Sequence, residues 1–255
     1  MPTTITSSPD LALVRLLEEC CFNAWPTLKT VHFDGWVIRL ADGHTRRANS
    51  ASALYPTTLP PEELVARVET LFRAHGLMPA FRLTPLAAPE LDAMLHQRGW
   101  RSHDPSVVLR AARIEGASQH ASIRIAPVAD AAWIEGSMRA YGYGSAGVRA
   151  LTRMLPNLAL PAAFLTVEEN GCDVGWALGV AERGHVGLYD LVVHAPARGR
   201  GIGRRMVAAL LAYGQQQGAS AAYLQTRISN EVAQALYASF GFREVYRYTN
   251  RVLET

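Results

Sequence analysis

The chain has 255 residues, of which 49% are apolar and 18% are charged, and its formal net charge is +3. This composition is typical of a globular protein in water, and the mild charge does not call for nucleic acid or a membrane surface as partner. The chain has three cysteines, too few and too poorly spaced for a disulfide framework or a zinc site. With neither a signal-peptide pattern nor an apolar run long enough to span a bilayer, we expect a cytoplasmic protein without a metal site.

The first half of the chain predicts helices and strands that follow an N-terminal segment, residues 1–8, without regular structure. A helical pattern begins at Asp10 and ends near Trp25-Pro26, where proline stops it. The other expected helices are 61–75 and 88–98, and the expected strands are 30–40, 45–54, 79–83 and a strand or hairpin at 106–110.

Residues 111–121 are small and polar and indicate a linker, so we expect two domains, residues 1–112 and 121–255. The second domain alternates strands and helices, which predicts an α/β (α+β) fold. Its expected strands are 123–127, 162–169, 173–181, 188–193, 221–227 and 242–253, and its expected helices are 130–140, 147–154, 203–216 and 230–240.

A glycine-rich turn joins the apolar strand at 188–193 to the following helix and carries the sequence Arg198-Gly-Arg-Gly-Ile-Gly203. Glycines let the backbone approach a ligand closely. The first N–H groups of the helix lack internal partners, and the helix dipole adds positive potential there. Four nearby arginines add charge, so the turn predicts a site for an anion such as a pyrophosphate: Arg198, Arg200, Arg204 and Arg205.

Two common phosphate-binding motifs do not fit this turn. A P-loop needs a lysine after its second glycine, and the single lysine of the chain is Lys29. A dinucleotide fingerprint needs a third glycine, where this chain has Arg204 or Met206 instead. The G-x-S-x-G motif of hydrolases is absent from the sequence as well.

A second motif follows the strand at 221–227. Asn230 is suited to cap the helix that follows, and Ala233 and Tyr237 fall on the same helical face as Asn230. Asn230 and Tyr237 would be about 10 Å apart along the axis, and the small Ala233 leaves room between them for an extended ligand arm.

Together the two motifs resemble those of the GNAT superfamily of acetyl-CoA-dependent N-acetyltransferases. The chain is similar to R-x-x-G-x-G at Arg198–Gly203 and to N-x-x-A-x-x-L-Y-x-x-x-G-F at Asn230–Phe242, and the resemblance covers residues 121–254. It implies the GNAT fold, a mixed and mostly antiparallel sheet flanked by helices. It also implies acetyl-CoA as acyl donor, held between splaying strands that here contain Leu191–Val193 and Leu224–Thr226.

The resemblance also implies roles for single residues. Backbone groups of Leu191, Val192 and Val193 would pair with the pantetheine arm, and the Val193 N–H would polarise the thioester carbonyl. Tyr237 would be the general acid that protonates the leaving thiolate. The remaining cofactor-binding residues would be Arg198, Gly199, Arg200, Gly201, Ile202, Gly203, Arg204 and Asn230.

The sequence does not decide which residue is the general base. Some GNAT relatives have a glutamate five residues before the asparagine, where this chain has Gln225, which cannot accept the proton. Asp190 and Glu168 on neighbouring strands are candidates, acting through water, and His194 is another. The segment Tyr141–Gly144 could line the acceptor pocket or be only a flexible turn.

The two halves of the chain share a short repeat. Residues 90–100 parallel residues 232–242, with Gly99 opposite Gly241 and Leu95 opposite Tyr237. The first half has Tyr55–Pro61, without glycine, where a pyrophosphate loop would stand. We therefore expect a GNAT-like N-terminal domain that has lost its cofactor site.

The sequence thus favours an enzyme that moves the acetyl group of acetyl-CoA to a primary amine by direct attack in a ternary complex. Its partners would be acetyl-CoA and an amine, with neither nucleic acid nor a membrane, and the protein would be a monomer or a homodimer. The alternative is a CoA-binding sensor or scaffold with little activity. The amine, on a small molecule or on a protein, is left open.

Overall fold

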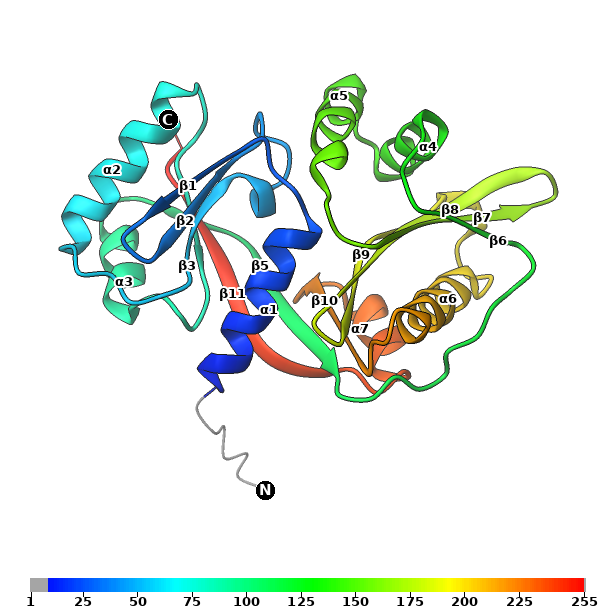
Figure 1. Ribbon diagram of the computed structural model, residues 1–255. Coiled ribbons are helices and arrows are strands. Elements are labelled where there is room, and N and C mark those ends of the chain that lie inside the picture. The colour runs from blue at the N-terminus through cyan, green and yellow to red at the C-terminus, as the bar shows by residue number, and fades with distance from the viewer. Residues whose placement is uncertain (1–8, 255) are drawn as a thin grey trace.

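The computed structural model describes residues 9–254, so the expectation for residues 1–8 lies outside the described part of the chain. One sheet of eleven strands runs through the molecule in the order β1-β2-β3-β4-β11-β5-β10-β9-β8-β7-β6. Its β3–β4 and β9–β10 pairs are parallel, and its other neighbours are antiparallel. Helices flank the sheet (Figure 1), which confirms the predicted mixed, mostly antiparallel α/β fold.

Within residues 9–111 the first half of the chain forms three α-helices and five strands. They are α1 (Leu11–Ala24), β1 (Lys29–Phe33), β2 (Trp36–Leu40), β3 (Ser50–Ala53), α2 (Pro61–Ala74), β4 (Ala80–Leu83), α3 (Pro89–Gln97) and β5 (Arg101–Ala111). The prediction of one strand over 30–40 was wrong, because Asp34 and Gly35 turn the chain with positive φ angles. The strand predicted over 45–54 was also too long, because Arg46–Ala48 form a short 3-10 helix.

The second half forms four helices and six strands. They are β6 (Ile123–Ala126), α4 (Ala131–Tyr141), α5 (Ser145–Met154), β7 (Ala162–Glu169), β8 (Cys172–Glu182), β9 (His185–Val193), α6 (Ile202–Gln216), β10 (Ala221–Arg227), α7 (Glu231–Ala238) and β11 (Arg243–Val252). These elements confirm the predicted order of the second half. Figure 1 shows α4 and α5 on one face of its sheet and α6 on the other.

The two halves repeat one arrangement and then exchange their last strands. In each half a hairpin is followed by a parallel pair joined through a helix: β3 and β4 through α2, and β9 and β10 through α6. The final strand of the second half, β11, pairs with β4 of the first half. The final strand of the first half, β5, pairs with β10 of the second half. Each half-sheet is therefore completed by a strand from the other half.

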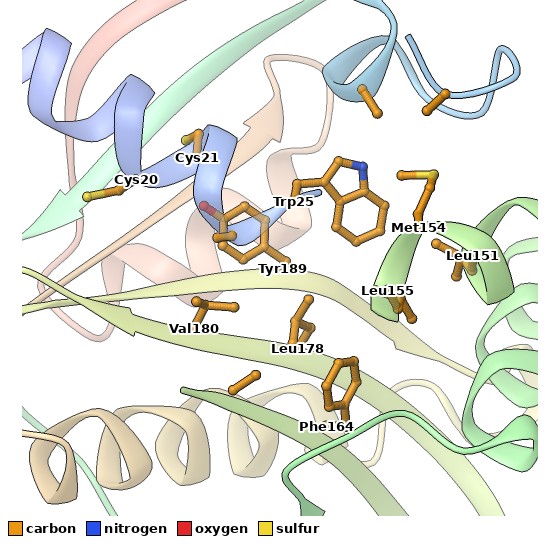
Figure 2. Close-up of a cluster of buried hydrophobic side chains, with 14 of the residues drawn as sticks. Cys20, Cys21, Trp25, Leu151, Met154, Leu155, Phe164, Leu178, Val180 and Tyr189 are labelled. Carbon is orange, nitrogen blue, oxygen red and sulfur yellow. The ribbon is translucent and has the colours of Figure 1, made fainter. Parts of the chain in front are cut away.

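The helix α1 also joins the halves through the central core. Its residues Cys20 and Cys21, together with its C-cap residue Trp25, are buried in one cluster with Tyr189 of β9 and Met154 of α5. Figure 2 shows Trp25 at the end of α1 facing Tyr189 and the α5 side chains across this cluster. Because burying a tryptophan removes a large apolar surface from water, this cluster fixes the first half against the second.

Candidate active site

The parallel pair β9 and β10 opens partway along its length. Its pairing runs from Ala221 opposite His185 to Leu224 opposite Leu188 and stops there. Beyond that point Gln225–Arg227 pair with β5, and Val192 and Val193 pair with β8 on the side away from β10. The facing edges of the two strands are thus free to take an extended ligand segment as an added strand.

A bulge in β9 lies where the strands separate. Asp190 has a φ of 47°, and the register between β8 and β9 shifts between Trp176 and Leu178. A non-glycine residue in this conformation stores backbone strain, and such strain clusters at functional sites. The Asp190 side chain is only 8% exposed, and its carboxylate lies 3.2 Å from the Arg47 guanidinium.

The charge of Asp190 is set by two opposed influences. Burial raises the pKa of its carboxyl above the ordinary value, and the nearby Arg47 guanidinium counteracts part of this rise. Arg47 comes from the first half of the chain and stacks over the Trp25 ring at 4.8 Å. The strand predicted over 45–54 contains Arg47 and gives no indication of its contact with Asp190.

The glycine-rich turn has the backbone shape that an anion site needs. Gly199 and Gly201 have φ angles of 77° and 73°, and no atom lies within 4 Å of a Cβ built on either. Gly201 is the N-cap of α6, and no side chain caps the helix. Arg198 donates from Nε to the Val193 carbonyl at 3.0 Å, which holds the turn against the end of β9.

The other predicted residues of the turn lie along the start of α6. Ile202 is buried, and Gly203 is half-buried with Leu236 of α7 at 3.4 Å from the position of a Cβ. Arg204 donates to Ser239 Oγ at 2.7 Å. Arg200 forms an ion pair of 2.6 Å with Glu169, which also pairs with Arg205, so the Arg200 guanidinium is already held by a protein carboxylate.

Helix α7 carries Asn230 and Tyr237. The Asn230 side chain caps the helix by accepting from the Ala233 N–H at 3.2 Å. Tyr237 is 8% exposed, and within residues 9–254 its hydroxyl forms no hydrogen bond. Burial raises the pKa of this phenol to about 12. Tyr237 therefore keeps its proton throughout the physiological pH range.

The turn Tyr141–Gly144 comes close to the opening. The Tyr141 hydroxyl donates to the Leu191 carbonyl at 3.4 Å, and Tyr141 as a whole is 40% exposed. Tyr143 packs against Tyr141 and, from the first half, His44, with ring centroids 5.9 and 5.5 Å apart.

The remaining base candidates have other surroundings. Glu168 forms an ion pair of 2.5 Å with Arg124, close to Asp173 at the end of the β7–β8 hairpin. His194 is exposed just after β9. The Gln225 side chain accepts from the Tyr248 hydroxyl at 3.0 Å. Of the carboxylates named from the sequence, Asp190 is the one at the point where β9 and β10 separate.

A cavity of about 190 Å³ lies beside the opening, and a second cavity of about 570 Å³ adjoins the first. They share the side chains of Thr45, Arg46, Asp104 and Tyr143 in their walls. The smaller one also reaches Gln225, Thr226 and Arg227 at the free end of β10. We refer to the two together as the acceptor cleft.

One wall of the acceptor cleft is the loop 41–47 of the first half. The buried Asn49 holds this loop, because its Oδ1 accepts from the N–H groups of Ala41 and Gly43 at 2.7 and 3.0 Å. Its Nδ2 donates to the carbonyls of His44 and Thr45. Such a network presents Arg46 and Arg47 on a fixed backbone. The run Arg46-Arg47-Ala48-Asn49 was the sequence signal for this loop, and it was not recognised because a strand was predicted over 45–54.

The position in the first half that corresponds to the glycine-rich turn is closed by the protein itself. The Asp34 carboxylate accepts from the backbone N–H groups of Thr58 and Leu59 at 2.7 and 3.0 Å, just before α2. It also accepts from the hydroxyls of Thr57 and Thr58. An internal carboxylate thus accepts from the backbone donors of this turn.

A sheet that opens at β9 and β10 beside an uncapped, glycine-rich helix start is the architecture of the GNAT acyltransferases, and this chain is an acyltransferase of that class. A family model matches residues 11–250, and the chain belongs to this family, described as "Probable histone acetyltransferase Rv0428c C-terminal".

Relatives and solved structures agree with this assignment. The chain is 21% identical to the uncharacterized N-acetyltransferase YobR of Bacillus subtilis over 94% of this chain and 98% of that protein. A GCN5-related N-acetyltransferase from Kribbella flavida has a TM-score of 0.66 at 18% identity, covering 98% of this chain and 97% of that one. A tandem GNAT protein from the clavulanic acid biosynthesis pathway has a TM-score of 0.62 at 14% identity, covering 86% and 77%.

Two other features are absent from residues 9–254. No helix there is long and apolar enough to cross a membrane. Within the same range, no three His, Cys, Asp or Glu side chains are grouped so that they could hold a metal ion.

Proposed function

We propose that the protein transfers the acetyl group of acetyl-CoA to a primary amine by direct attack in a ternary complex. The observation that carries this proposal is the strand opening at Leu188 and Leu224, followed by an uncapped helix start. Tyr237 belongs to the apolar cluster against which Leu191 and Val193 of β9 pack. We assign the second half of the chain, residues 121–255, to acetyl-CoA binding and place the protein in the cytoplasm.

The donor would bind along the open edge of β9. Backbone groups of Leu191, Val192 and Val193 would pair with the pantetheine arm, and Asn230 would contact that arm from α7. The backbone N–H groups from Gly199 to Gly203 would hold the pyrophosphate. Arg198 and Arg204 add positive charge there, whereas Arg200 contributes less because Glu169 already neutralises it.

In the reaction the amine nitrogen attacks the thioester carbon, so that a C–N bond forms and the C–S bond breaks. The departing thiolate takes the Tyr237 proton, and the nitrogen loses a proton to Asp190, directly or through water. A raised pKa makes Asp190 a stronger base than an ordinary carboxylate, and its pairing with Arg47 fixes its position. The Val193 N–H would stabilise the developing oxyanion.

The first half of the chain, residues 1–112, would complete the acceptor side instead of binding a second donor. It supplies Arg47 to Asp190 and one wall of the acceptor cleft. Because β5 and β11 are exchanged, we propose that the two domains are units of function that fold together.

The first test measures donor binding and chemistry separately. At a hundred times its dissociation constant acetyl-CoA should stabilise the fold by about 2.7 kcal/mol, visible as a higher melting temperature. Release of CoA thiol in the presence of an amine panel then reports turnover. Binding without turnover of any amine would favour the CoA-sensor alternative, and failure to bind at millimolar acetyl-CoA would contradict both functions.

The role of Tyr237 is tested by Tyr237→Phe, which should lower kcat about 100-fold because general acid catalysis contributes at least that much. The dissociation constant of acetyl-CoA should change little. The matched control is Tyr213→Phe, which removes a phenol from α6 outside the acceptor cleft. A parallel loss of affinity and kcat in Tyr237→Phe would mean that this residue is structural.

A further inference from the structure

The acceptor cleft is lined by more cations than anions. Its walls contain two carboxylates, Asp42 and Asp104, and five guanidinium groups: Arg46, Arg47, Arg149, Arg153 and Arg227. Three of the arginines are neutralised by ion pairs, Arg153 by Asp42, Arg227 by Asp104 at 3.1 Å and Arg47 by Asp190 at 3.2 Å.

The other two arginines keep an unbalanced charge. Within residues 9–254, Arg46 and Arg149 have no carboxylate at ion-pair distance. His44, which lines the same cleft, stays neutral near pH 7, because burial and the charge of Arg47 lower its pKa. The cleft is therefore positive, and Arg46 lies in the wall that its two cavities share.

From this charge pattern we propose that the acceptor is a small primary amine that also carries a carboxylate, and that Arg46 binds this carboxylate. The inference rests on the proposed acetyl transfer and names its substrate class. A guanidinium presents paired N–H donors that match the two oxygens of a carboxylate, and Arg46 has no protein anion to compete for them. Cavities of about 190 and 570 Å³ suit a small molecule.

The backbone places the carboxylate site next to the reacting centre. Arg46 and Arg47 are consecutive in a short 3-10 helix, and the Asn49 network fixes the loop before them. Arg47 contacts Asp190 at the strand opening, while Arg46 faces the cleft. Because Arg47 also lines the smaller cavity, a substrate held at Arg46 by its carboxylate would lie in a cavity whose wall reaches Asp190 through Arg47.

The positive charge of the cleft also helps the acceptor amine to lose its proton, for which Gln225 cannot serve as the base. Nearby positive charge disfavours an ammonium ion and so lowers the pKa of a bound amine. A larger share of the acceptor is then neutral and able to attack, which reduces the demand on the base. The same charge disfavours a lysine-rich protein segment, whose neighbouring cations would be repelled.

The test uses matched acceptors that differ in one group. Glycine, β-alanine and 4-aminobutyrate are compared with their amides, at saturating acetyl-CoA, by CoA thiol release. Since a charge-assisted hydrogen bond is worth about 1.5–3 kcal/mol, at least one carboxylate should exceed its amide about tenfold or more in kcat/KM. Arg46→Gln should remove this preference, and Arg46→Lys should restore part of it. Arg67→Gln, at an exposed ion pair on α2, is the control and should keep the preference.

Three results would overturn the inference: amides preferred over carboxylates, faster acetylation of a lysine-rich peptide, or a preference that persists in Arg46→Gln. Calorimetric titration of 4-aminobutyrate into the CoA-bound protein separates this inference from the proposed function. Binding that requires Arg46 without turnover of any amine supports the carboxylate site while the acetyl transfer fails. Absence of binding by all three carboxylates, with other amines acetylated, rejects the carboxylate site and leaves the acetyl transfer standing.

Discussion

The two halves of this molecule differ at one equivalent position of the fold, the turn between a parallel strand and the helix that follows it. Between β9 and α6 the turn is open, with Gly199 and Gly201 at positive φ and an uncapped helix start. Between β3 and α2 the equivalent turn has no glycine, and the Asp34 carboxylate accepts from the backbone N–H groups there. In the first half, a side chain of the protein accepts from the backbone N–H groups of the turn. In the second half, the corresponding N–H groups are left without a side-chain acceptor within residues 9–254.

The closure of the first half depends on a tight hairpin. A Cβ on Gly35 would lie 2.5 Å from the Tyr55 carbonyl oxygen, so only glycine allows the β1–β2 turn to approach the loop before α2. This contact brings Asp34 to the loop.

The helices α3 and α7 give a second comparison, in which the backbone at the C-terminus has the same conformation and the side chain at the matched position differs. Gly99 and Gly241 have φ angles of 82° and 81°. The N–H groups of Trp100 and Phe242 bond back to Leu95 and Tyr237 at 3.0 and 3.2 Å, an arrangement common at helix C-termini. The side chains at the matched position are an apolar leucine and a buried phenol.

Of the substitutions that test the contrast between the two turns, Gly201→Val should have the largest effect, a loss of acetyl-CoA affinity. Valine is disfavoured at a φ of 73°, and its side chain would enter the space in front of the α6 N–H groups. The dissociation constant of acetyl-CoA, measured by calorimetry, should rise about 100-fold or more, a loss of about 2.7 kcal/mol. Pro60→Ala, at the matching N-cap of α2, should leave it unchanged. Unaltered binding in Gly201→Val would mean that the turn does not hold the donor.

Arg47→Gln should have an intermediate effect and tests whether the first half acts on the site of the second. A catalytic base is active above its pKa and loses activity as the pH falls through it. Arg47 lowers the pKa of Asp190 against the effect of burial, so its removal raises that pKa. The acid limb of the kcat/KM profile should therefore move to higher pH, and Arg47→Lys should bring it back. A limb that stays in place would exclude Asp190 as the titrating base.

Asp34→Asn should have the smallest effect, confined to stability. Hydrogen bonds to the Asp34 carboxylate, of which the one from the Thr57 hydroxyl has the largest effect, hold the pKa of Asp34 below its ordinary value of 3.8. The ionised form therefore stabilises the fold above that ordinary value, and this contribution is lost as the pH falls through the lower folded-state pKa. The melting temperature of Asp34→Asn should be lower than that of the natural chain at pH 7, and the difference should shrink in acid.

Acetyl-CoA affinity provides the control for Asp34→Asn and should not change, because we propose that the donor binds to the second half. Glu62→Gln, in the first turn of the same α2 helix, should give a smaller shift of the melting temperature at pH 7. An equal shift in both variants would mean that Asp34 acts only through the helix dipole.

Local sequence patterns were sufficient for most elements and for the glycine-rich turn. Proline, glycine and apolar periodicity placed α2, α6 and β7 close to their observed bounds, because each depends on neighbours within a few residues. The same reasoning failed over residues 30–54. The Asp34-Gly35 dipeptide is a local hairpin signal that the expectation of a single strand overlooked. The loop held by Asn49 depends on a hydrogen-bond network, which periodicity does not report.

The sequence by itself determined the family, the two signature motifs and the absence of a glycine loop from the first half. Only the tertiary structure decided that β5 and β11 are exchanged, that Arg47 meets Asp190, and that Arg46 lines the acceptor cleft. Arg47 and Asp190 are 143 residues apart along the chain. Such long-range pairings arise from how the half-sheets join, whereas a motif records only chemistry that lies within one turn or helix.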